Sequence, residues 1–212
     1  SHNYKLFGVG AGTEVKTTSY FFYENLNPLV GEPVLKRASE LDAEEIIASA
    51  MRTSESYRGE YLQTLPTIDK RISTTYYVGT KGDEIADYSH NYKLFGVGAG
   101  TEVKTTSYFF YENLNPQPLE GLLKRASELD AEEIIASAMK TSVSYRGEFQ
   151  ETLPTIDKRT STTYYVGTKG DEIADYSHNY KLFGVGAGTE VKTTSYFFYE
   201  NLNPQPLEGL LK

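Results

Sequence analysis

Ser89–Pro116 reads SHNYKLFGVGAGTEVKTTSYFFYENLNP, and the chain is organised around this stretch because it occurs three times. Ser1–Pro28 and Ser177–Pro204 carry the same letters, so the copies start 88 residues apart. Between them lies a second unit, Lys36–Tyr88, which returns with few changes as Lys124–Tyr176. We name the first stretch unit A and the second unit B, and the chain then reads A-B-A-B-A.

Unit A has the pattern of a β-hairpin. In its first copy, Asn3–Val9 is a short apolar run and Gly10–Gly12 is a glycine-rich turn. Glu14–Leu26 then predicts a long strand whose side chains alternate between two faces. Around Tyr20–Tyr23 both faces are aromatic, so we expect cover on both sides. Pro28 ends the strand because proline has no amide hydrogen for a sheet.

Unit B opens with the pattern of a helix. Asp42 and Glu45 have the spacing of a capping box, and Ile46, Ile47, Ala50 and Met51 follow at helical spacing. These features predict one helix near residues 42–53 and another near 130–141.

Three strands should follow each helix. The first two are predicted around Tyr57–Thr64 and over Asp69–Val78, separated by a turn at Leu65–Thr67. A second turn at Thr80–Asp83 leads into a third strand, which begins at Glu84 and runs into the next unit A.

The predicted fold class is therefore α+β, a tandem repeat of one helix plus a four-stranded antiparallel β-meander, dominated by strands. Unit A is followed by the segment in which its copies differ, and such changes concentrate at module boundaries. We accordingly predict a partial repeat over residues 1–35, a first full module over 36–123 and a second over 124–212.

Composition narrows the possible partners. The chain of 212 residues has a formal net charge of −8, which argues against nucleic acid as a partner. No window approaches 18 apolar residues, so no membrane partner is expected. There are no cysteines, which excludes disulfides and thiolate metal sites and leaves the compartment undecided. The first residue is not Met and lies inside a repeat, which suggests a processed or engineered product.

Catalytic motifs fail on geometry. Histidine occurs once per unit A, at His2, His90 and His178, and Asp87 precedes His90 by three residues. A Ser-His-Asp triad fails because Ser89 and His90 are neighbours on an extended strand and point to opposite faces. The glycines of unit A superficially match a phosphate-binding loop, but that motif needs a helix after them and a strand follows instead.

A metal site is also not expected. Asp83, Glu84, Asp87 and His90 are hard ligands, but their spacing matches neither calcium loops nor zinc sites. We interpret them as a solvated strand with a bulge at Tyr88–Ser89. The sequence thus predicts no catalytic residue, no metal and no cofactor, and we expect a protein that is not an enzyme.

The favoured function is self-association. Any grouping of A-B-A-B-A leaves one unit A without a unit B, and an isolated hairpin is marginally stable and exposes its edges. That hairpin must pack on its own chain or on another. We therefore expect a structural or assembly protein, either a natural repeat array or an engineered concatemer, that associates with itself by strand or hairpin exchange.

The alternative function is a multivalent module for small ligands or glycans. The chain has 18 tyrosines, and aromatic rings serve as stacking platforms. The candidate stacking residues are the tyrosines repeated in unit A and its copy: Tyr4, Tyr20, Tyr23, Tyr92, Tyr108 and Tyr111.

A candidate interface comes from the few positions at which the two B units differ. If the hairpin of unit B turns about Thr67, Leu62 faces Ile72, while the polar pair Gln150 and Thr160 occupies the same place in the second copy. We expect the apolar pair to be the more buried one. Tyr61, which is Phe149 in the second copy, completes this candidate interface with Leu62 and Ile72.

Overall fold

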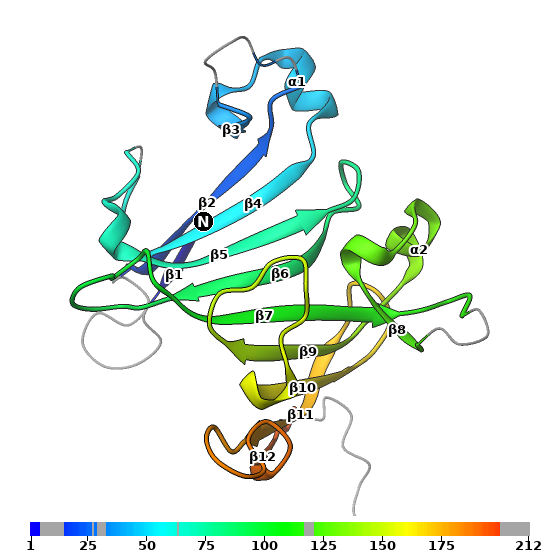
Figure 1. The fold of residues 1–212 in the computed structure, drawn as a ribbon. Helices are drawn as coiled ribbons and strands as arrows, with labels where there is room; N and C mark the ends of the chain where they lie inside the picture. Colours follow the sequence, from blue (N-terminus) through cyan, green and yellow to red (C-terminus); the bar gives the residue numbers. More distant parts are fainter. Residues whose placement is uncertain (5–14, 27, 29–32, 63, 117–120, 200–212) are drawn as a thin grey trace, which may run out of the picture.

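The computed structural model describes residues 1–4, 15–26, 28, 33–62, 64–116 and 121–199. Its described part is one open antiparallel sheet of twelve strands, shown in Figure 1. The strands are β1 (His2–Tyr4), β2 (Val15–Glu24), β3 (Leu35–Arg37), β4 (Met51–Arg58), β5 (Arg71–Val78), β6 (Ile85–Tyr92), β7 (Val103–Glu112), β8 (Leu123–Arg125), β9 (Met139–Arg146), β10 (Arg159–Val166), β11 (Ile173–Tyr180) and β12 (Val191–Tyr196).

Ten of these strands follow one another in the order β1-β2-β4-β5-β6-β7-β9-β10-β11-β12. The short strands β3 and β8 lie off this path and pair with β2 and β7, respectively. All the pairs are antiparallel, and each strand between the two ends of the path is hydrogen-bonded to a strand on either side.

The predicted repeat of separate helix-plus-meander units is wrong. β7 pairs with β9 from Thr105 to Tyr111, so the sheet crosses the predicted boundary between residues 123 and 124 without interruption. The physical reason is that a four-stranded meander has unpaired backbone groups along two edges, and pairing with the next repeat satisfies them. The predicted division of the chain into residues 1–35, 36–123 and 124–212 stays a prediction.

The predicted helices begin at the expected place but end early. Asp42 caps the first helix by accepting hydrogen bonds from the amides of Glu44 and Glu45, at 2.9 and 2.8 Å. The chain is already extended at Ser49, and the next residues form β4. The helix ends early because the residues after it pair within the sheet: Thr53 pairs with β2 on one side and with β5 on the other. The described helices are α1 (Ala43–Ala48) and α2 (Ala131–Ala136), with 3-10 turns η1 (Ala38–Glu40), η2 (Ile68–Lys70), η3 (Ala126–Glu128) and η4 (Ile156–Lys158).

The glycine-rich turn of unit A is a loop that packs against the neighbouring hairpin. In the first copy the turn lies outside the described residues, and in the second it joins β6 to β7. Gly100 has φ +69°, and a Cβ on it would lie 1.7 Å from the carbonyl oxygen of Ile68 in η2. Gly96 also has a positive φ, +77°, but a Cβ on it would have no neighbouring atom within 4 Å. Close approach therefore requires glycine at residue 100.

We predict that Gly100→Ala destabilises the chain more than Gly96→Ala does. Both changes place alanine in the left-handed region, at a cost of about 1–2 kcal/mol. Only Gly100→Ala also forces the Ile68 carbonyl away. Thermal unfolding should show a clearly lower Tm for this variant, and equal melting temperatures would contradict the packing of the loop on η2.

Candidate self-association site

The sheet carries two kinds of projection that meet between the repeats. An arm leaves the ends of β2 and β7: the first arm is residues 35–48 and the second arm is residues 123–136. A hairpin tip joins β5 to β6 and β10 to β11: the first tip is residues 78–87 and the second tip is residues 166–175. The second arm packs on the first tip (Figure 1).

An apolar cluster forms one half of this contact. Ile85 of the first tip packs with Ala126, Leu129 and Ile134 of the second arm, and Tyr111 of β7 completes the buried set. Burial of one such aliphatic side chain contributes about 1.5–3 kcal/mol. Among the described residues, this buried apolar cluster lies at the contact between arm and tip.

A buried ion pair forms the other half. Arg125 of the second arm donates to Asp87 of the first tip through Nη2 and Nε, at 2.6 and 3.3 Å. The Ser127 amide and hydroxyl add hydrogen bonds to Oδ1, at 3.3 and 3.2 Å. Each of the two charged side chains is only 6 % exposed. A buried pair of this kind needs such full hydrogen bonding to offset the loss of hydration.

The aromatic rings of unit A surround the arginine. The Arg125 guanidinium lies 4.6 Å from the ring centroid of Tyr108, which is fully buried. Burial raises the pKa of Tyr108 to about 12, against the opposing effect of the Arg125 charge. The Tyr111 hydroxyl donates to the Ala86 carbonyl at 2.8 Å, and burial raises its pKa as well. The second arm and first tip are thus joined by apolar, ionic and aromatic contacts.

The interpretation of Asp87 and His90 as solvated is wrong. Both side chains are buried, and His90 contacts the Phe149 carbonyl through Nε2 at 2.9 Å. Its ring also packs against Tyr88 in the same strand. Among the described residues, no three His, Asp or Glu side chains gather in a way that could hold a metal. Sequence reasoning missed these partners because Asp87 and Arg125 are 38 residues apart.

The same surfaces are uncovered at the two ends of the sheet. At the N-terminal end, Ile46 of the first arm is 50 % exposed, whereas its copy Ile134 is 9 % exposed. At the C-terminal end, Ile173 of the second tip is 44 % exposed, whereas its copy Ile85 is 8 % exposed. Asp175, the copy of Asp87, is exposed too. The first arm and the second tip are therefore complementary surfaces.

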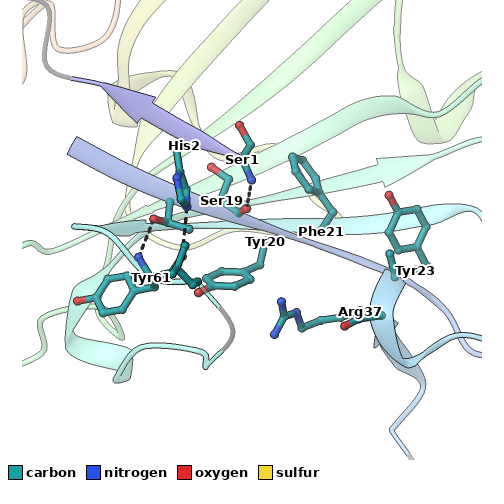
Figure 2. Close-up of a pocket in the computed structure, with 12 residues that line it drawn as sticks. Ser1, His2, Ser19, Tyr20, Phe21, Tyr23, Arg37 and Tyr61 are labelled. Atoms are coloured by element: carbon teal, nitrogen blue, oxygen red, sulfur yellow. Dashed lines mark hydrogen bonds between the residues drawn. The ribbon is translucent and has the colours of Figure 1, made fainter. Parts of the chain in front are cut away.

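A groove of about 290 Å³ lies beside the first arm, and Figure 2 shows its lining. The Arg37 side chain extends toward Tyr20, with its guanidinium 4.8 Å from the ring centroid. Ser1 and His2 lie at one side, and Tyr61 lies below them. The groove lies beside the first arm at the place that corresponds to the contact of the first tip with Arg125 and Tyr108 beside the second arm.

The candidate stacking tyrosines do not form a common exposed face. Tyr20, Tyr92, Tyr108 and Tyr111 are buried, and a covered ring has no free face for a sugar. Tyr4 is exposed on β1, and Tyr23 is half-buried on β2 beside the groove. A stacking role stays a prediction for these two residues.

The predicted pairing of Leu62 with Ile72 is wrong. β4 ends at Arg58, because Gly59 turns the chain with φ +104°, and Leu62 lies beyond the strand with 73 % exposure. Ile72 is half-buried in β5, and it stands at a bulge between the positions that pair with β4. Gln150, the copy of Leu62, is exposed as well, so the expected contrast at this position is absent.

Leu62 and Tyr61 do line the groove beside the first arm. The Tyr61 amide donates to Thr18 Oγ1 at 3.2 Å, and its carbonyl contacts His2 Nε2 at 3.2 Å. The role of these residues in an interface stays a prediction, at a different place from the one the sequence suggested.

Comparisons with known proteins identify no relative: no family model, no curated protein and no solved structure matches this chain. Within the described ranges, the helices are too short to cross a membrane.

We predict that Asp87→Asn destabilises the chain strongly, whereas Asp175→Asn does not. The first change leaves the Arg125 charge buried without its carboxylate, at a cost on the order of 3–5 kcal/mol. The second alters a copy that is exposed in the single chain, and at protein concentrations at which the chain is monomeric it should change the stability by no more than about 0.5 kcal/mol. Urea unfolding measures the loss of stability in both variants. Equal losses would show that the Asp87–Arg125 contact stabilises the fold no more than an exposed aspartate does.

Alkaline unfolding should depend on Tyr108. The folded chain holds the Tyr108 proton with a pKa of about 12, above the ordinary value of 10.0 for tyrosine. This contribution to stability is complete below pH 10 and is lost as the pH rises toward 12. Tyr108→Phe removes the ionisable group and should move the alkaline unfolding midpoint upward in circular dichroism.

Tyr196→Phe is the matched control, because Tyr196 is the copy of Tyr108 and is 66 % exposed. At protein concentrations at which the chain is monomeric, it should leave the alkaline midpoint unchanged. A shift of the same size in both variants would mean that burial of Tyr108 does not set the alkaline limit.

Proposed function

We propose that this chain is a non-catalytic assembly protein that associates with further copies of itself by exchanging unit A. One observation carries the proposal. Ile173 and Asp175 in the second tip, and Tyr196 in β12, are exposed, whereas the same residues one repeat earlier are buried in the contact with the second arm. Exposed aromatic and aliphatic surface of this kind is typical of an interaction site.

Exchange needs a place that either copy of unit A can occupy, and β4 provides one. β2 of the first unit A pairs with β4, with the Ser19 and Ser56 hydroxyls 2.9 Å apart. The third unit A has the same letters, so β12 of a second chain can pair with β4 in the same register, with Ser195 in the place of Ser19. The pairing lost by β2 equals the pairing gained by β12, and the exchange itself costs little.

The gain on exchange comes from residues that the first unit A lacks. The third unit A brings the second tip with it, and this tip then lies on the first arm as the first tip lies on the second arm. Burial of Ile173 would contribute about 1.5–3 kcal/mol. Asp175 would gain Arg37 as its partner, in the arrangement seen for Asp87 and Arg125.

Cysteine pairs test the exchange directly, because the unmodified chain has no cysteine. Ser56 and Ser195 become neighbours only when β12 pairs with β4, and directly opposed residues in a sheet are close enough for a disulfide. We expect the variant Ser56→Cys with Ser195→Cys to form disulfide-linked dimers and larger species under mild oxidation, seen on non-reducing gels. Light scattering of the unmodified chain should show mass rising with concentration.

The matched control is Ser19→Cys with Ser56→Cys, which should link within one chain whenever the first unit A is in place. Two outcomes contradict self-association. The first is absence of any bond between residues 56 and 195. The second is a bond confined to single chains, which would mean that the eight strands β4 to β7 and β9 to β12 close on themselves.

A further inference from the structure

We propose that the groove beside the first arm is a peptide-binding site for the extended segment Ile-Ala-Asp-Tyr. Its occupant in the assembly is Ile173–Tyr176 of a second copy, which reaches the first arm when β11 and β12 of that copy replace β1 and β2. Ser177 and Tyr196 of the second copy then stand in the places of Ser1 and Tyr20, with the same residue types. This inference rests on the proposed function, and it names the contact that makes exchange of unit A more favourable than the unexchanged state.

The interior of the sheet already contains the bound form. Ile85–Tyr88 has the same four letters and lies on the second arm. Its isoleucine enters the apolar cluster, its aspartate pairs with Arg125, and its tyrosine stands opposite Tyr108 in the sheet register. Each side chain except the alanine has a defined partner, and the Ala86 carbonyl accepts the Tyr111 hydroxyl.

The groove offers the copies of these partners in the same arrangement. Arg37 stands for Arg125, and its guanidinium lies 4.8 Å from the Tyr20 ring, compared with 4.6 Å for Arg125 over Tyr108. The cationic part of the site therefore has its bound geometry before a peptide arrives. Such preorganisation lowers the entropy that binding must overcome.

The register of the peptide is set by Ser1. The Ser1 amino group donates to the Ser19 carbonyl at 2.9 Å, and the Ser19 amide donates to the Ser1 carbonyl at 2.8 Å. Ser89 and Ser107 are paired in the same way, directly after Tyr88. A peptide that ends next to Ser1 thus places its tyrosine opposite Tyr20 and its aspartate against Arg37.

The apolar end of the site is the open face of the first arm. Ala38 and Ile46 are exposed and Leu41 is half-buried, whereas their copies in the second arm are all buried around Ile85. An aliphatic residue two positions before the aspartate would cover this face. The site therefore selects an aliphatic residue, an acid and an aromatic residue at fixed spacing.

An N-terminal extension tests the site without a separate ligand. The full chain preceded by Asp-Glu-Ile-Ala-Asp-Tyr, copied from residues 171–176, would fill its own groove. The matched control carries the same residues in the order Tyr-Asp-Ala-Glu-Ile-Asp. We expect the copied extension to raise Tm by several degrees and to reduce assembly to monomers, because the third unit A then gains nothing by exchange. The scrambled extension should do neither.

A second variant identifies the contact. Arg37→Met should cancel most of the Tm increase given by the copied extension, because the aspartate loses its partner. If copied and scrambled extensions give the same Tm and the same mass, the peptide site is wrong even when the unmodified chain assembles. If the unmodified chain is monomeric but the copied extension still raises Tm through Arg37, the site stands and the proposed self-association fails.

Discussion

The buried ion pair between Asp87 and Arg125 is the contact on which the rest of the structure depends. Removal of a carboxylate and a guanidinium from water is costly, and the cost is recovered only when every polar atom finds a partner. Here the hydroxyl and amide of Ser127 and the carbonyl of Glu151 supply the remaining hydrogen bonds. The pair joins one repeat to the next, and it fixes the aromatic and apolar groups that pack around it.

The environment of each repeat depends on its neighbours and not on its own letters. Tyr108 and Tyr196 stand at the same position of an identical stretch, yet one is fully buried and the other is 66 % exposed. The difference arises because the second arm covers Tyr108, while Tyr196 lies at the edge of the sheet. A repeat chain of this kind has stability that grows with each interior junction, as nearest-neighbour contacts predict.

Local pattern predicted part of this fold and long-range contact decided the rest. The alternating aromatic strand of unit A and the helix cap at Asp42 follow from short-range rules, and both are present. The end of the helix could not be read in this way, because pairing of Met51–Arg58 with two strands overrides helical spacing. The continuation of the sheet through both repeats could not be predicted either, because it depends on the pairing of strand edges that meet only in the folded chain.

The candidate site was less accessible to sequence reasoning than the fold. The proposal of self-association came from counting the units of the repeat and stays a proposal. The pairing of Leu62 with Ile72 assumed a hairpin that Gly59 interrupts. Asp87 looked like a surface charge, because its partner Arg125 follows it by 38 residues and lies in another unit B. The one feature of the sequence that could have indicated its role is that Asp87 recurs as Asp175, at the same distance before the histidine of unit A.

The most direct measurement of the central claim is a double-mutant cycle between Asp87 and Arg125. Asp87→Asn, Arg125→Met and the double variant are compared with the unmodified chain in urea unfolding. If this pair joins the repeats, the double variant loses much less stability than the two single losses added together, with a coupling free energy of about 2–3 kcal/mol. Additive losses, with a coupling near zero, would show that the repeats are held together by other contacts.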